Sequence, residues 1–60
     1  MDDKLLLTIP EAAQRVGLGR SKLYELIQAG DVPVVRIGRA VRISAERLRE
    51  WTEKLEREQA

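Results

Sequence analysis

The stretch GLGRSKLYELIQAG, residues 17–30, decides the fold that the other segments complete. Two glycines around one leucine predict a sharp turn in which a single apolar side chain points inward. A short helix follows, because apolar residues then recur at the i, i+3, i+4 spacing of one helix face. These apolar residues are Leu23, Leu26 and Ile27. Gly30 predicts a left-handed cap at the end of that helix, and Pro33 prevents its continuation.

The exposed face of this helix is polar, and donor groups open it. Its first turn carries a guanidinium, a hydroxyl and an ammonium group, and a tyrosine lies near the edge of the face. Such donors bind phosphate oxygens and base edges. We therefore interpret the segment as a recognition helix with four candidate nucleic-acid contacts, namely Arg20, Ser21, Lys22 and Tyr24.

A second short helix is predicted over residues 9–16, directly before the turn. Thr8 and Glu11 form the T-x-x-E pattern of a capping box, and Pro10 falls in the first turn, where its missing N–H costs nothing. Its inward face is expected at Ile9, Ala12, Ala13 and Val16. Two helices joined by a glycine turn have the dimensions of a helix-turn-helix, although a purely structural helical hairpin shows the same pattern and stays open. Residues 5–7 are either a short strand or an apolar plug on the core.

Residues 34–43 predict a tight β-hairpin. Two β-branched runs flank a Gly38-Arg39 connection, which is the composition of a two-residue turn with glycine at positive φ. Arg39 then lies at the tip, and Arg36 and Arg42 lie outward nearby. Arginine can protect strand edges against aggregation, but edge protection does not account for a third cation at the tip. We favour a wing that reaches the minor groove or the adjacent phosphates.

A last helix is predicted after Ser44, which is a good N-cap. Its inward stripe is expected at Ala45, Leu48, Trp51, Thr52 and Leu55. Trp51 lies at the centre of this stripe, so we expect it in the core rather than as a stacking platform for bases. Residues 1–4 and 57–60 are expected to be loose.

Composition limits the possible functions. Sixty residues make one domain, residues 1–60, with only a small core. The absence of cysteine and histidine excludes disulfides and thiolate metal sites, and it removes the commonest general base. We therefore expect no enzyme activity, no cofactor and no metal. The longest apolar run, residues 5–7, is far too short to span a membrane, so a cytoplasmic setting is the default expectation.

Charge is unevenly distributed along the chain. The formal net charge is +1, but residues 20–43 carry five basic and two acidic side chains, a net charge of +3. Such an excess can be ordinary solubility charge. Its position on the candidate recognition helix and hairpin favours a polyanionic partner instead.

Four segments together resemble one family, the excisionase-type, MerR-like winged helix-turn-helix proteins. They read LTIPEAA at residues 7–13, GRSKLYELIQAG at residues 19–30, VRIGRAVRI at residues 35–43 and SAERLREW at residues 44–51. The resemblance covers about residues 6–52. It implies an α+β, mainly helical fold with two short helices, a β-hairpin wing and a C-terminal helix.

The resemblance also implies sequence-specific binding of double-stranded DNA, with the second helix in the major groove and the wing in an adjacent minor groove. By this likeness Arg20, Ser21, Lys22 and Tyr24 match the family's recognition-helix contacts, and Arg36, Arg39 and Arg42 match its wing cations. Two positions depart from the family pattern. Gly19 replaces the usual Ser or Thr N-cap, and Val41 stands where an aromatic residue is common.

Three functions from two classes, DNA binding and protein interaction, stay open at this point. The favoured function is an excisionase, or recombination directionality factor, that binds and bends DNA beside an integrase. Cooperative self-association on DNA and a location in a phage or a prokaryotic nucleoid are expected with it. A small transcriptional regulator of the same fold fits the same residues. A protein-interaction module with a basic hairpin fits the charge but leaves the helix-turn-helix spacing unexplained.

Overall fold

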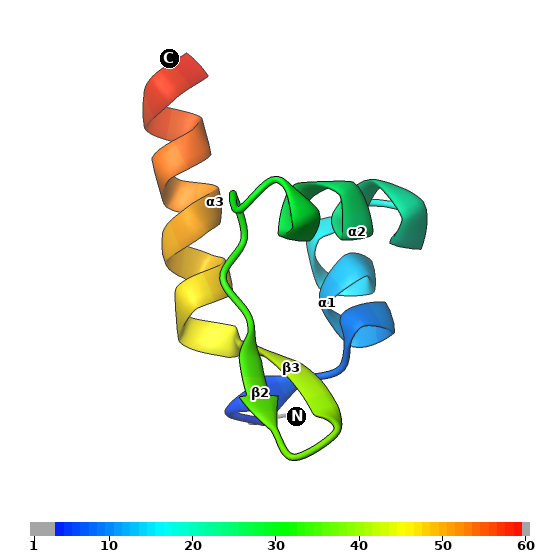
Figure 1. Cartoon of the computed structure of the whole chain (residues 1–60). Coiled ribbons are helices and arrows are strands. Elements are labelled where there is room, and N and C mark those ends of the chain that lie inside the picture. Colours follow the sequence, from blue (N-terminus) through cyan, green and yellow to red (C-terminus); the bar gives the residue numbers. More distant parts are fainter. Residues whose placement is uncertain (1–3, 60) are drawn as a thin grey trace.

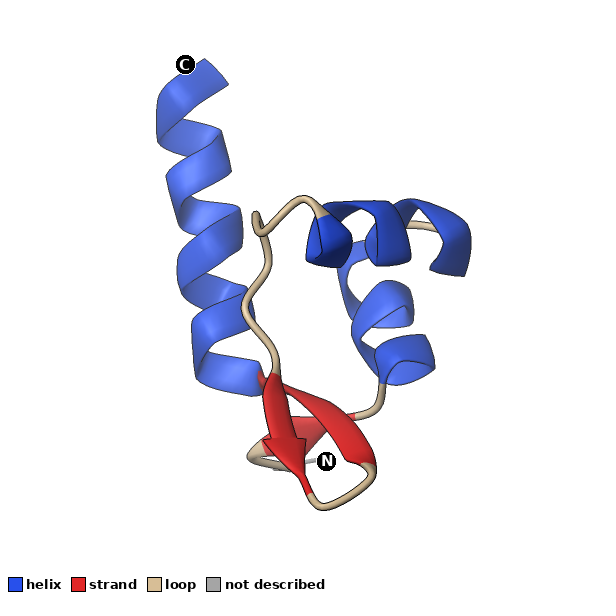
Figure 2. Ribbon diagram, in the orientation of Figure 1, coloured by secondary structure: helices blue, strands red, loops and turns tan. Residues whose placement is uncertain are grey.

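The computed structural model describes residues 4–59, which form three helices and a three-stranded sheet (Figure 1). In chain order the elements are β1 (Leu6–Leu7), α1 (Ile9–Val16), α2 (Arg20–Gln28), β2 (Val35–Ile37), β3 (Ala40–Ser44) and α3 (Ala45–Gln59). Figure 2 shows the sheet at one end of the molecule, with α3 on one side and the α1–α2 pair on the other. The expected α+β, mainly helical winged helix-turn-helix is confirmed.

The core lies where these three parts meet. Its buried side chains come from five elements and one turn: Leu7, Ile9, Ala12, Ala13, Leu23, Val32, Ile43 and Leu48. The small alanines of α1 allow α2 to pack closely. Trp51 is half-buried and packs against this core, as expected from its position on the apolar stripe of α3. Val32 is only 2% exposed although it belongs to the turn after α2, so that turn is tied to the core.

The sheet has the strand order β1-β3-β2 with both pairs antiparallel. Leu7 lies opposite Ile43, so residues 5–7 contribute a short strand rather than a plug. The predicted hairpin is confirmed, because Ile37 pairs with Ala40 and leaves a two-residue loop. Gly38 in that loop has a φ of 59°, a conformation that favours glycine. The first strand of the hairpin, β2, starts at Val35 rather than at the expected residue 34.

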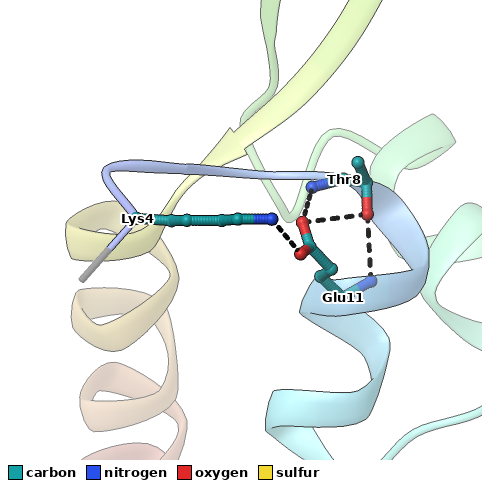
Figure 3. Close-up of polar contacts among 3 residues, drawn as sticks. All are labelled: Lys4, Thr8 and Glu11. Atoms are coloured by element: carbon teal, nitrogen blue, oxygen red, sulfur yellow. Dashed lines mark hydrogen bonds and ion pairs between the residues drawn. The ribbon is translucent and has the colours of Figure 1, made fainter. Parts of the chain in front are cut away.

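The start of α1 has the predicted capping box (Figure 3). The Glu11 N–H donates to Thr8 Oγ1 over 3.3 Å, and the Thr8 N–H donates to Glu11 Oε1 over 2.9 Å. The Lys4 ammonium pairs with the other carboxylate oxygen of Glu11. The hydrogen bond from Lys4, followed by that from the Thr8 N–H, lowers the pKa of Glu11 from its ordinary 4.5 to about 2.

The structure describes part of the two ends that were expected to be loose, and that expectation stays a prediction. Lys4 is held by its ion pair, and α3 stays helical as far as Gln59. The rest of the expectation of loose ends concerns residues 1–3 and 60, which lie outside the described residues. Within residues 4–59, no helix combines the length and the apolar character needed to cross a membrane.

Candidate nucleic-acid interface

Helix α2 is oriented by one completely buried residue, Leu23. Leu26 and Ile27 are half-buried beside it, while the polar residues of the helix are exposed. An α-helix turns by roughly 100° per residue, so Ser21, Glu25 and Gln28 lie within about 40° of the direction opposite Leu23. These three residues form the centre of the exposed face. Lys22 lies on one flank of that face.

The structure therefore divides the four predicted contacts of α2. Ser21 lies at the centre of the exposed face, Lys22 lies on one flank, and Tyr24 and Arg20 lie on the other. Tyr24 is 47% exposed, so its ring rests partly on the protein and its hydroxyl end can still reach a ligand. In a groove, such a helix presents its centre to the bases and its flanks to the two phosphate walls.

Two further residues, Glu25 and Gln28, lie on this exposed face and were not among the predicted contacts. Both are exposed and both lie near the centre of the face. Their position on the exposed face could have been predicted from the sequence, because the angle of each residue from Leu23 follows from residue spacing alone. Residue type alone does not indicate them, because an acid and an amide are not typical phosphate-binding groups. Glu25 also contacts a predicted residue, because its Oε1 lies 3.9 Å from the Lys22 ammonium.

The start of α2 offers a favourable environment for an anion. Gly19 is the N-cap, with extended backbone at φ −72° and ψ 158°, and within residues 4–59 no side chain caps this end. The first turn carries Arg20 and Lys22 but no acidic residue. The free N–H groups and the positive end of the helix dipole attract negative charge, and two cations beside them strengthen that attraction. The family departure at Gly19 thus leaves the end of the helix open to a ligand.

The hairpin does not place its three arginines together in the way that the sequence suggested. Arg39 is exposed at the tip. Arg36 lies opposite Val41, and Arg42 lies opposite Val35. Directly paired residues point to the same side of a sheet, so Arg36 and Arg42 point to opposite sides. Arg36 and Arg42 were expected to lie outward near one another at the tip. This expectation is wrong, because the two-residue loop pairs residue 36 with residue 41 and so points the two arginines to opposite sides.

The two flanking arginines also differ in their surroundings. Arg36 is exposed on the edge strand β2. Arg42 is half-buried on the central strand β3, and its Nη1 donates to the Val41 carbonyl over 2.9 Å. Edge protection therefore fits Arg36, on an edge strand, better than Arg42, which lies on the central strand and is half-buried. Val41 is half-buried against the core, so the wing is anchored there without an aromatic ring.

The described part of the chain contains no group of three acidic side chains placed to hold a metal ion. Polar groups on α2 are solvent-exposed rather than enclosed, as described above. The arrangement suits binding of an extended anionic surface by donors presented from a helix and a hairpin.

Comparison with known proteins places this geometry in a family. Residues 6–56 match the family model described as "Helix-turn-helix domain". An excisionase of Streptomyces ambofaciens is 37% identical over 46 residues, which are 77% of this chain and 74% of that protein. The chain belongs to the excisionase-type helix-turn-helix family.

Other relatives of this excisionase-type chain extend the picture. A probable excisionase of Saccharopolyspora erythraea is 40% identical over 55 residues, covering 92% of this chain and 56% of that protein. A putative DNA-binding protein of Mycobacterium tuberculosis is 33% identical over 48 residues, covering 80% of this chain and 62% of that protein. The chain thus spans little more than half the length of the first of these relatives. No solved structure matches the chain.

Proposed function

We propose that this chain binds double-stranded DNA sequence-specifically and acts as an excisionase, bending DNA beside an integrase. The observation that carries the proposal is the start of α2, where an uncapped helix end and two cations face solvent. Cations at the positive end of a helix do not stabilise the fold, because the helix dipole repels them. They do favour the binding of a phosphate group at the same helix end.

In the proposed complex α2 lies in the major groove. Ser21, Glu25 and Gln28 then face the base edges. Arg20 and Lys22 start from the flanks of the helix, from which a long side chain reaches either a phosphate of the groove wall or a neighbouring base edge. The wing lies over an adjacent minor groove with Arg39 foremost. Arg36 and Arg42, on opposite sides of the hairpin, are placed to meet the backbones on either side of it.

The two relatives named as excisionases support the recombination role. The relative named only as a putative DNA-binding protein supports the wider alternative, a small transcriptional regulator of the same fold. Both roles use the same DNA-binding residues. An excision assay with the neighbouring integrase and its attachment-site DNA separates them, because only an excisionase raises the yield of excised product.

DNA binding itself is tested by selection from a pool of random duplexes, followed by sequencing, at two salt concentrations. A specific reader enriches a short motif, and its affinity falls steeply with salt because several phosphate contacts release counterions. Tandem copies of the motif in the enriched duplexes would indicate cooperative binding. Absence of binding even at low salt would contradict the proposal and favour a protein-interaction module whose basic hairpin docks an acidic partner.

A further inference from the structure

One acidic side chain stands at the centre of the exposed face of α2. Glu25 lies about 160° around the helix from the buried Leu23, and 70% of its side chain is exposed. The other charged residues of the helix, Arg20 and Lys22, are basic. A carboxylate that approaches DNA is repelled by phosphates and by every base acceptor, so its position requires a hydrogen-bond donor on the DNA.

In the major groove only two base groups can supply that donor, the N4 amino group of cytosine and the N6 amino group of adenine. The structure favours cytosine, because Lys22 lies next to Glu25 on the helix surface. The ammonium of Lys22 lies 3.9 Å from Glu25 Oε1, so a donor and an acceptor are presented side by side.

A G·C pair shows the complementary pattern. Guanine presents two neighbouring acceptors, O6 and N7, and cytosine presents its amino donor next to them. The ammonium suits the guanine acceptors, and the carboxylate suits the cytosine donor. An A·T pair instead places its donor between two single acceptors, so the ammonium loses one of its two partners.

We infer that Lys22 and Glu25 together read one G·C base pair, with the ammonium on guanine and the carboxylate on the amino group of cytosine. The inference rests on the proposed function, since it needs α2 in the major groove. It adds a specificity-determining residue, Glu25, and it gives Lys22 a base to contact. Exchanging the two bases of the pair reverses the pattern and is disfavoured.

The test starts from the motif that the parent protein selects from random duplexes. Each base pair of that motif is replaced in turn by the other three, and competition binding ranks the duplexes for the parent, Glu25→Gln and Lys22→Met. We expect one position at which the parent prefers G·C by at least about fivefold. At that position Glu25→Gln shifts the preference to A·T, because glutamine pairs with adenine N6 and N7. Lys22→Met reduces the preference for guanine at the same position.

The matched control is Glu50→Gln, which removes the same charge from the exposed side of α3. It is expected to keep the parent's preference at every position. Thermal melting confirms that the variants are folded, as expected for exposed substitutions.

The outcomes separate the inference from the function on which it rests. A parent that enriches a motif, together with a Glu25→Gln variant that keeps every preference, overturns the inference and leaves DNA binding intact. A Lys22→Met variant that weakens all duplexes equally overturns the paired reading, because the ammonium then contacts a phosphate. A parent that enriches nothing overturns the proposed function itself.

Discussion

Helices α1 and α2 are eight and nine residues long, yet their first turns are capped and charged in opposite ways. The start of α1 is closed by Thr8 and Glu11, and its last turn carries the basic Arg15, so both ends complement the helix dipole. The start of α2 has glycine as its cap and two cations in its first turn. Helix α1 is thus stabilised by its own sequence, whereas α2 is held by the buried Leu23 and keeps its start available for a ligand.

The largest effect expected from this difference is on DNA affinity. Replacing Arg20 and Lys22 together by alanine removes two of the proposed DNA contacts of α2. We expect the affinity for the selected duplex to fall at least about 30-fold, since each such contact contributes about 1–3 kcal/mol. The melting temperature should stay the same or rise, because two cations leave the positive end of the helix. Titration of a labelled duplex and thermal melting measure the two quantities.

The matched control removes two cations from α3 instead, as Lys54→Ala with Arg57→Ala. Both residues are exposed, and Lys54 lines a hollow with Leu26, near the C-terminal end of α2 and away from its first turn. If this control loses as much affinity as the α2 variant, net charge rather than the start of α2 determines binding, and the contrast between the two helices has no functional meaning.

The next effect concerns stability and belongs to α1. Thr8→Ala removes the N-cap and should lower the free energy of unfolding by about 1 kcal/mol. In a chain of this size that corresponds to a fall in melting temperature of about 4–8 °C. DNA affinity measured well below the transition should be unchanged. A loss of affinity without a loss of stability would show that α1, and not only α2, contacts the DNA.

A pH dependence should come from the same cap. The pKa of Glu11 is lowered to about 2 in the folded protein, below its ordinary value of 4.5. Its ionised form therefore stabilises the fold fully above about pH 4.5, and this contribution disappears as the pH falls toward 2. Glu11→Gln lacks this contribution, so the melting temperatures of parent and variant should converge between pH 4.5 and 2. A difference that stays constant over this range would contradict the assignment.

The smallest effect comes from giving α2 the cap that it lacks. At Gly19 the backbone is extended, and an added Cβ would meet no atom within 4 Å, so serine and aspartate both fit. Gly19→Ser should raise the free energy of unfolding by a few tenths of a kcal/mol. Gly19→Asp should stabilise similarly but weaken DNA binding more than Gly19→Ser, most clearly at low salt. Equal affinities for the two variants would mean that this helix end does not approach phosphates.

Local sequence was sufficient to predict most of the fold. Both helices of the helix-turn-helix were predicted because their limits are set by local chemistry, the Thr8 cap at one end and the glycines at the others. The hairpin loop followed from the Gly38-Arg39 pair in the same way. Burial of Val32 could not be predicted from its neighbours, because it depends on how the turn after α2 meets the core.

The candidate site was harder to predict because it depends on direction as well as on residue type. Arg36 and Arg42 look alike in the sequence, yet the register points them to opposite sides of the wing. Glu25 is not predicted from residue type, because phosphates repel an acid, yet its angle from Leu23 places it at the centre of the exposed face. Loop length determines the directions of Arg36 and Arg42, and helical phase determines the direction of Glu25. A prediction that used these two quantities would have placed all three side chains correctly.

The junction between the wing and α3 has a mechanical consequence. Ser44 is the last residue of β3, and its Oγ accepts from the Arg47 N–H at the start of α3. The Ala45 N–H donates to the Leu5 carbonyl over 2.9 Å, which fastens the same point to the N-terminal segment. Strand β3 runs into α3 without an intervening loop, so these hydrogen bonds fix the direction of α3 relative to the wing. The C-terminal end of α3 therefore keeps one direction relative to the DNA that the wing is proposed to contact.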